Sequence, residues 1–264
     1  MKFGISLKPV TPMRDNPSEK SEMVNQILFG EHFIIDEMTE KWAKITTGFD
    51  SYQGWVDNKM ITEINEHDYK TIDNDLHIVN VPFTQIYNQE SKAPIRISIG
   101  SVIPFYDKEK QTFKINNTTY SINKSSVTKI DNSHLKRILR TAELFLNTPY
   151  LWGGKNILGI DCSGFIQNVF RINGISLPRD ASQQYTIGEK IDFKDIYPGD
   201  LLFFKNDNGN VTHVGMYYNN GKIIHSSGDV HVDLITEEGI YSEKLNKITH
   251  KNPEAFRLKI SRRK

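Results

Sequence analysis

The chain has 264 residues, with 33 Lys and Arg against 32 Asp and Glu, so its formal net charge is +1. This balance provides no electrostatic footprint for a nucleic acid, and no run of 18 apolar residues predicts a membrane span. The chain is long enough for more than one domain. Its single cysteine, Cys162, excludes an intramolecular disulfide and leaves packing or reactivity as the role of the thiol.

Residues 1–130 consist of short alternating apolar runs separated by Gly, Asn, Asp and Pro, which is typical of small β-barrels. Within these residues, two stretches each have a glycine followed at a similar distance by an aromatic residue. Trp42 lies twelve residues after Gly30, and Phe113 lies thirteen residues after Gly100. The pattern predicts an internal repeat, with one small all-β barrel over 1–72 and a second over 73–130. A chance recurrence of β-patterning is the alternative.

Residues 131–264 begin with two predicted helices. Asp131, Asn132 or Ser133 is placed to cap a helix over 134–147, in which apolar residues recur at helical spacing. A second helix is expected directly after Cys162, with Gly174 as its end.

Strand-like runs follow, with Asn220-Gly221 as a strong signal for a hairpin turn. The predicted strands cover 200–204, 212–218, 222–225 and 256–260. Helices followed by an antiparallel meander predict an α+β domain over 131–264.

Cys162 lies in the first turn of the second predicted helix, where free backbone N–H groups and the helix dipole favour a thiolate and lower the pKa. A cysteine nucleophile needs a base and a group that orients the base. His213 and His225 lie on two strands that the hairpin pairs, so the two rings can meet on one face. Zinc is the competing interpretation, but the chain lacks a second cysteine and any HExxH motif. We therefore expect no metal and no cofactor.

These residues also carry a family resemblance. The runs TPYLWGG, DCSGFIQNVFRINGISLPRDASQQ, PGDLLFF and THVGMYYNNGKIIHSSG, between roughly residues 135 and 260, closely resemble the catalytic domain of NlpC-type cell-wall cysteine peptidases. The resemblance implies a papain-like fold with Cys162 as nucleophile, His213 as base and His225 as the polar third member. The runs PVTPMR, SEMVNQILFGE, KWAKI and DSYQGW resemble the bacterial SH3 domains of one branch of that family.

That branch cleaves the bond between γ-D-glutamate and the diamino acid of peptidoglycan stem peptides with a free N-terminal L-alanine. Asp161 is suited to bind the alanine ammonium, and Ser163 adds a hydroxyl. The resemblance matches Glu22 and Tyr52 to the same pocket and Tyr150 to a substrate-facing position. The alternatives are a solvated charge for Glu22, a turn aromatic for Tyr52 and a packing aromatic for Tyr150.

The sequence thus predicts a monomeric cysteine endopeptidase acting on L-Ala-γ-D-Glu-diamino acid peptides, with an α+β papain-like domain after two SH3-like barrels. Arg179 and Asp180 are expected to form a local structural ion pair. The first residues lack an apolar export signal, which predicts a cytoplasmic role in peptide recycling, or a periplasmic or secreted one if a signal was removed. The rival functions are a non-catalytic peptidoglycan-binding SH3 module and a thiol acyltransferase on the same fold.

Overall fold

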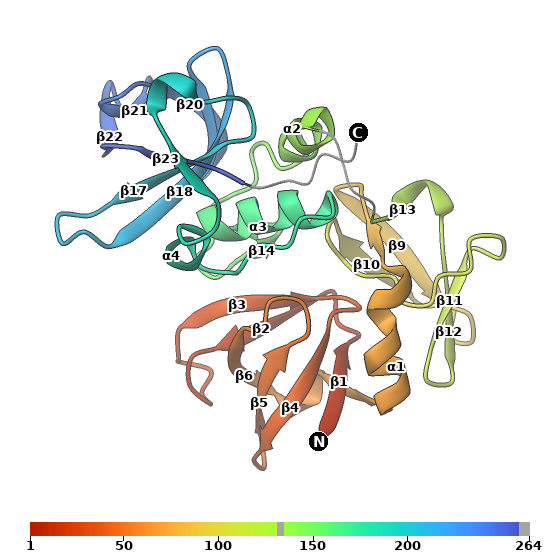
Figure 1. Ribbon diagram of the computed structural model, residues 1–264. Coiled ribbons are helices and arrows are strands. Elements are labelled where there is room, and N and C mark those ends of the chain that lie inside the picture. Colours follow the sequence, from red (N-terminus) through yellow and green to blue (C-terminus); the bar gives the residue numbers. More distant parts are fainter. Residues whose placement is uncertain (131–134, 259–264) are drawn as a thin grey trace. The chain divides into compact units, whose positions relative to one another are not determined.

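The computed structural model describes residues 1–130 and 135–258 (Figure 1). The chain divides into two compact units, one formed by Met1–Asp131 with Trp152–Ile157, the other by Asn132–Leu151 with Leu158–Lys264. The predicted caps at 131–133 and the end of the last predicted strand at 259–260 lie outside the described residues. None of the described helices is long and apolar enough to span a membrane.

The first unit begins with a seven-stranded antiparallel sheet in the order β3-β2-β6-β5-β4-β1-β7. Its strands are β1 (Lys2–Ser6), β2 (Val10–Arg14), β3 (Met23–Leu28), β4 (His32–Met38), β5 (Trp42–Thr47), β6 (Gln53–Asp57) and β7 (Ile61–Ile64), with the 3₁₀ turn η1 (Asn58–Met60) before β7. Burial alternates along β5, where Ala43 and Ile45 are fully buried between half-buried neighbours. This period of two directs the apolar residues of the strand into one core.

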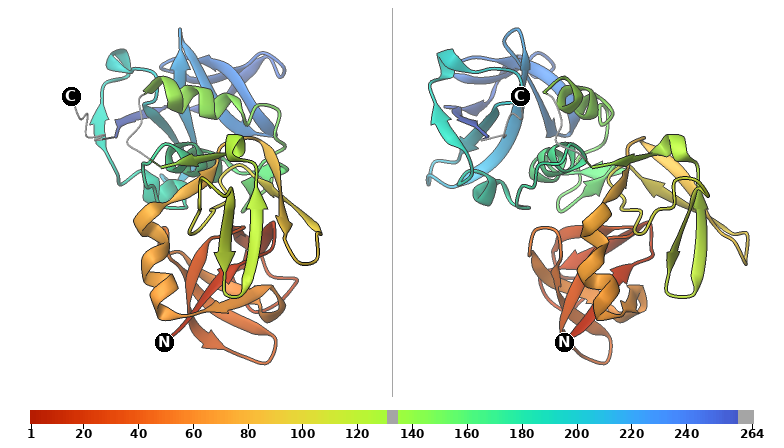
Figure 2. Two further views of the ribbon diagram at one scale, coloured as in Figure 1. Left: turned by 90° about the vertical axis from the view of Figure 1, so that its right-hand side faces the viewer. Right: turned by 45° about the vertical axis from the view of Figure 1, so that its right-hand side comes forward.

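The remainder of this unit forms a second sheet in the order β10-β9-β12-β11 and a pair of strands, β8 and β13. The elements are α1 (Glu66–Thr71), η2 (Ile72–Asp75), β8 (His77–Val79), β9 (Phe83–Asn88), β10 (Pro94–Ser98), β11 (Thr112–Ile115), β12 (Thr118–Ile122), η3 (Lys124–Ser126) and β13 (Val127–Lys129). Helix α1 packs on β1 (Figure 2). The rings of Tyr69 and Phe3 stack with their centroids 4.4 Å apart. One apolar cluster contains Phe29 from the first sheet region and Ile86 from the second, so both share a core.

The predicted repeat is supported by the backbone hydrogen bonds around its two glycines. The N–H of Gly30 donates to the carbonyl of Ser6, and the N–H of Gly100 donates to the carbonyl of Val79 in the same way. Both glycines have a positive φ, +78° and +89°. The predicted all-β character of this region is confirmed, and the described strand pairings leave both sheets open at their ends, so neither sheet closes into a full barrel. The shared core explains how open sheets still bury their apolar faces.

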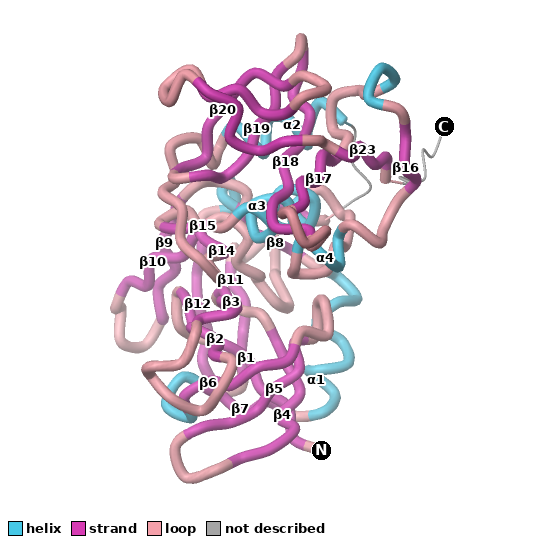
Figure 3. Tube along the Cα trace, turned by 90° about the vertical axis from the view of Figure 1, so that its left-hand side faces the viewer, coloured by secondary structure: helices cyan, strands magenta, loops and turns pink. Residues whose placement is uncertain are grey.

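The described part of the second unit contains three helices and an eight-stranded sheet in the order β16-β23-β17-β18-β19-β20-β21-β22. Figure 3 distinguishes its helices from its strands by colour. Its first elements are α2 (Leu135–Glu143), β15 (Gly159–Ile160), α3 (Cys162–Ile172), α4 (Ala181–Gln184), β16 (Glu189–Ile191) and η4 (Phe193–Asp195). The strands that follow are β17 (Leu201–Lys205), β18 (Val211–Asn219), β19 (Lys222–Ser227), β20 (Asp229–Ile235), β21 (Gly239–Ser242), β22 (Lys247–Lys251) and β23 (Glu254–Arg257). The short strand β14 (Lys155–Asn156) belongs to the first unit.

Helix α3 lies at the centre of the second unit and is buried along its whole length. It packs against β18 and β19 and against α2. The Asp161 carboxylate caps its start by accepting a hydrogen bond of 2.6 Å from the N–H of Gly164. The chain leaves the helix at Gly174, whose φ of +77° suits glycine, so the predicted end of the helix is confirmed.

The hairpin between β18 and β19 is also confirmed. Asn220 and Gly221 have φ values of +46° and +70°, as a type I′ turn requires. The turn sets the register in which Gly215 lies opposite His225. The predictions did not include the later strands β20, β21 and β22, which extend the meander beyond this hairpin.

Candidate active site

Cys162 is the first residue of α3, as predicted, and its side chain is buried. Burial and, to a smaller extent, the neighbouring Asp161 carboxylate raise the pKa of the thiol to about 12. The backbone N–H groups of Val214 and Ser163 act in the opposite direction and lower the pKa, but they do not compensate for burial. The expectation of a lowered pKa is therefore wrong for this structure. The thiol carries its proton at neutral pH.

His213 on β18 and His225 on β19 meet as predicted. The Nε2 atom of His213 lies 2.9 Å from the Nδ1 atom of His225, and the two rings are nearly perpendicular. Burial lowers the pKa of both imidazoles, most strongly that of His213. Two neutral rings share one proton across this bond, so one nitrogen donates and the other accepts.

A glycine makes room for this ring pair. A Cβ atom added to Gly215 would lie 2.9 Å from the Cβ of His225, closer than real Cβ contacts come. The glycine of the THVG run therefore permits the close approach of β18 to the His225 side of β19. Gly215 therefore has a structural role in the THVG run, because it allows the two strands to come close beside the histidine pair.

Four polar residues that the sequence reasoning missed surround the two histidines. Asp233 Oδ2 lies 3.5 Å from His225 Nε2 and 3.1 Å from His231 Nε2. The Nδ1 atom of His231 lies 2.7 Å from Asp229 Oδ1. Asp229, His231 and Asp233 alternate along β20 and so share one face of the sheet, a spacing that could have revealed them.

The fourth missed residue is His250 on β22. Its ring stacks on that of His213 with centroids 4.1 Å apart. Burial lowers the pKa of His250 to about 4, and the nearby His225 adds to the effect. The stacked ring covers one face of the His213 imidazole and is itself neutral at pH 7.

Arg179 differs from its expected role. It is 1% exposed, and its Nη2 atom lies 2.6 Å from Asp161 Oδ2 while Nη1 lies 3.0 Å from Asp161 Oδ1. The same Nη1 atom donates to Ser163 Oγ at 2.9 Å. The ion pair of Arg179 therefore reaches the start of the cysteine helix, whereas we expected a local pair with Asp180. Arg179 thus holds Asp161 by a bidentate contact and Ser163 by a further hydrogen bond, and these are the residues on either side of Cys162.

Tyr150 lies in the same unit, half-buried, and its N–H donates to the carbonyl of Gly228 at 2.8 Å. Burial raises the pKa of Tyr150 to about 12, and the charges of Cys162 and Asp161 act in the same direction. The structure thus brings together Tyr150, Asp161, Cys162 and Ser163, four of the predicted site residues.

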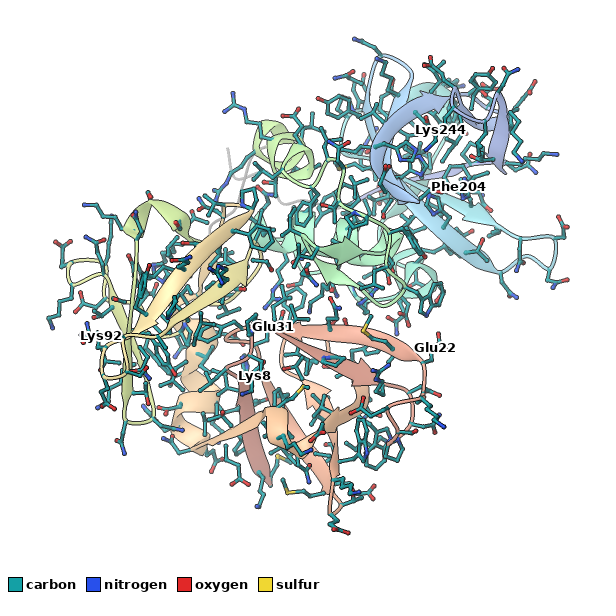
Figure 4. The ribbon with its side chains drawn as sticks, turned by 180° about the vertical axis from the view of Figure 1, so that it is seen from behind. Lys8, Glu22, Glu31, Lys92, Phe204 and Lys244 are labelled. Atoms are coloured by element: carbon teal, nitrogen blue, oxygen red, sulfur yellow. The ribbon has the colours of Figure 1, made fainter. Side chains whose placement is uncertain are left out.

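Glu22 and Tyr52 lie in the first unit. Glu22 directly precedes β3 and is exposed (Figure 4). Its Oε1 accepts a hydrogen bond of 2.5 Å from Trp152 Nε1. Tyr52 is half-buried and packs against the apolar cluster around Ile45. Glu22 is therefore more than a solvated charge, since it binds the segment that carries Trp152.

That segment, Trp152–Ile157, is anchored to the first unit by a buried ion pair. Lys155 Nζ lies 3.0 Å from both carboxylate oxygens of Glu31, and both side chains are at most 5% exposed. The N–H of Lys155 donates to Gln26 Oε1 on β3 at 2.8 Å. These contacts fix the residues that directly follow Tyr150 and Leu151 in the chain.

Comparison with known proteins places this geometry in a family. Residues 147–249 match the model of the NlpC/P60 family, and residues 13–61 match that of the bacterial dipeptidyl-peptidase SH3 domain. The chain is 30% identical over 240 residues to the gamma-D-glutamyl-L-lysine dipeptidyl-peptidase of Bacillus subtilis, covering 83% of this chain and 78% of that protein. It is 25% identical over 249 residues to dipeptidyl-peptidase 6 of Lysinibacillus sphaericus, covering 84% and 88%.

The fold agrees with a solved structure. An NlpC/P60 family protein from Bacillus cereus superposes with a TM-score of 0.82 at 20% identity, covering 97% of this chain and 99% of that one. The chain therefore belongs to the NlpC/P60 family and carries an all-β SH3-like region before its NlpC/P60 domain.

Proposed function

We propose that the protein is a cysteine peptidase that cleaves the bond between γ-D-glutamate and the diamino acid of peptidoglycan stem peptides. The observation that carries the proposal is the buried bond between His213 and His225 in the unit whose central helix begins with Cys162. Two relatives that match most of this chain are named gamma-D-glutamyl-L-lysine dipeptidyl-peptidases, which supports the substrate class.

The reaction begins when the Cys162 sulfur attacks the carbonyl carbon of the γ-glutamyl amide. His213 accepts the thiol proton and then donates it to the leaving amine, so the C–N bond breaks and a thioester remains. A water molecule then attacks the thioester with His213 as base, which releases the acid and restores the thiol. The backbone N–H of Cys162 stabilises the oxyanion in both steps.

The two nitrogen atoms of each histidine ring have different roles in this reaction. Since His213 Nε2 is engaged by His225, the Nδ1 atom is the base for the thiol. This role requires a proton on His213 Nε2, donated to His225 Nδ1, and a proton on His225 Nε2, directed at Asp233 Oδ2. The negative charge of Asp233, 3.5 Å from His225 Nε2, favours a proton on that atom and so favours this tautomer of both rings.

Because burial raises the pKa of the thiol and lowers that of His213, the resting pair is neutral. The proton therefore moves together with the attack, as in general base catalysis, and no preformed thiolate is needed. The His213 ring is already neutral at pH 7, so it can accept the thiol proton without first losing one of its own.

A free L-alanine amine is the second part of the proposal. We propose that Asp161, Ser163 and Tyr150 contact the substrate beside the thiol, and that Glu22 and Tyr52 bind it as well. Asp161 already accepts hydrogen bonds from Arg179, so any ammonium would share this carboxylate with a cation already present. Glu22→Gln keeps a hydrogen-bond acceptor for Trp152 and removes only the negative charge, so it tests whether that charge contributes to substrate binding.

Mass spectrometry of the products tests both parts. L-Ala-γ-D-Glu-diaminopimelate and the L-lysine analogue should each yield L-Ala-γ-D-Glu, and Cys162→Ala should yield none. Acetylation removes the positive charge of the alanine amine and should lower kcat/KM at least ~100-fold, since the loss of a charged hydrogen bond to a buried carboxylate costs about 3 kcal/mol. Exchange of the exposed His67 for Gln is the matched control for His213→Gln. Hydrolysis by Cys162→Ala would contradict the proposed mechanism. An unchanged rate on the acetylated peptide would contradict the requirement for a free amine.

We further propose that the protein acts on free peptides during recycling in the cytoplasm. The alanine amine is free only after the peptide has left the glycan strand, which fits an enzyme for released fragments. Fractionation of native cells with an antibody to the protein checks this setting, and recovery mainly from the envelope or the medium would contradict it.

A further inference from the structure

A cluster of metal-ligating side chains lies on the sheet face behind His213. One ligand atom from each of His225, His231 and Asp233 lies within 4.8 Å of the other two. His225 and His231 are directly opposite each other on β19 and β20, and Asp233 follows two residues after His231 on the same face. The backbone register therefore holds three ligand atoms together without help from a mobile loop.

The hydrogen bonds of this cluster leave a place for a cation. His231 Nδ1 lies 2.7 Å from Asp229 Oδ1 and must carry a proton to donate to it. In a neutral ring the Nε2 atom is then a lone pair, and it faces a carboxylate oxygen of Asp233 at 3.1 Å. Two acceptors in contact repel unless a proton or a metal ion lies between them.

The Nε2 atom of His225, the third ligand atom, also lacks a partner in the usual hydrogen-bond range. His225 is 1% exposed, and its Nε2 atom has no hydrogen-bond partner of ordinary geometry among the described residues. Asp233 Oδ2 is its neighbour at 3.5 Å, beyond the usual hydrogen-bond range. A buried ring nitrogen is thus directed at the same carboxylate oxygen as His231.

We propose that His225, His231 and Asp233 bind one divalent transition metal ion, with Zn²⁺ as the best fit. Ligands about 2.0–2.1 Å from a tetrahedral zinc ion lie roughly 3.3 Å apart, and the two distances to Asp233 Oδ2 lie on either side of this value. Asp229 orients His231 through the far ring nitrogen, as carboxylates do for zinc-bound imidazoles. His231 is 32% exposed and provides the route of entry, with a water molecule as fourth ligand.

Metal binding switches the proposed peptidase off, a consequence that rests on the proposed function. A metal on His225 Nε2 requires the proton of that ring to sit on Nδ1, so His225 donates to His213 Nε2 instead of accepting from it. Neutral His213 then carries its own proton on Nδ1, the atom proposed above as the base. In this tautomer the ring cannot accept the thiol proton. The number of protons on the two rings is unchanged, and only their positions reverse.

Binding is tested first without catalysis, in the Cys162→Ala variant, so that the thiol cannot be the ligand. Calorimetry with Zn²⁺ should give one site, and Co²⁺ should produce visible absorption bands of a tetrahedral ion. His231→Gln in the same background should weaken binding at least ~10-fold, while the exposed control His67→Gln should not. No binding to Cys162→Ala, or equal binding after His231→Gln, would overturn the site.

The switch is tested on the active protein. Zn²⁺ should inhibit hydrolysis and a chelator should restore it, and His231→Gln should keep the metal-free rate within about threefold while needing at least ~10-fold more Zn²⁺ for inhibition. Equal zinc sensitivity of His231→Gln and the wild type would overturn the switch. If the peptidase proposal itself fails, the calorimetric result on Cys162→Ala still decides the metal site.

Discussion

The ion pair between Arg179 and Asp161 predicts a large and specific loss of stability. Arg179→Met removes the guanidinium but keeps most of the side-chain volume. It leaves the Asp161 carboxylate, whose side chain is 9% exposed, without its cation. Removing one partner of a buried pair costs about 3–5 kcal/mol, because the remaining charge has lost both water and its counterion. We expect the free energy of unfolding to fall by about this amount at pH 7.

A double variant separates the lost charge pair from other damage. Asn at position 161 still accepts a hydrogen bond from Gly164, so Asp161→Asn keeps the helix cap while it removes the charge. Combined with Arg179→Met it should recover about 2 kcal/mol relative to Arg179→Met alone. Urea unfolding followed by circular dichroism measures all variants.

The control is a cation in the same unit that is mostly exposed. Lys190 pairs with Glu254, which also contacts Lys205 at 2.6 Å, so Lys190→Met leaves no charge alone and should cost less than about 1 kcal/mol. If Arg179→Met costs no more than Lys190→Met at an unchanged denaturant slope, the reasoning about the buried pair is refuted. It is refuted equally if the double variant is no more stable than Arg179→Met.

Three further predictions concern other parts of the chain. Asp233→Leu should lower kcat/KM at least ~10-fold with little change in KM, because His225 loses the nearby carboxylate that favours a proton on its Nε2; an unchanged rate would contradict this role. Gly30→Ala should lower the melting temperature more than Gly209→Ala, since both have positive φ but only at Gly30 would a Cβ meet a backbone oxygen, at 2.0 Å; equal shifts would contradict the clash. Hydrogen bonds from lysines lower the pKa of Glu254 from 4.5 to about 2, so its contribution to stability is present above pH 4.5 and lost as the pH falls toward 2. Urea midpoints of Glu254→Gln should therefore fall less than those of the wild type between pH 6 and pH 3, and parallel curves would contradict the linkage.

Local signals were sufficient to predict the parts of the site that depend on one turn or one helix end. Asn220-Gly221 determines the pairing of β18 with β19 and so the meeting of His213 with His225. The start of α3 was predicted because capping and helical spacing act within a few residues.

The errors arose where distant segments determine the outcome. The pKa of Cys162 is raised because the folded unit buries the thiol, and no local pattern reports that burial. Arg179 pairs with a residue 18 positions away, whereas the prediction chose its neighbour in sequence. His250 reaches His213 only because β22 continues a meander whose later strands lack a strong turn signal. That the two small all-β regions are open sheets sharing one core also depends on contacts between distant segments, which no local pattern reports.

The segment Trp152–Ile157 has a consequence for how such a chain evolves. The polypeptide leaves the second unit after Leu151, contributes Lys155 to the first unit and returns at Leu158. A recombination event with a single junction near residue 131 would separate Lys155 from Glu31 and leave a buried charge on each side. Exchange of the SH3-like region between relatives therefore requires that β14 be exchanged with it, and we expect the two to be inherited as one block.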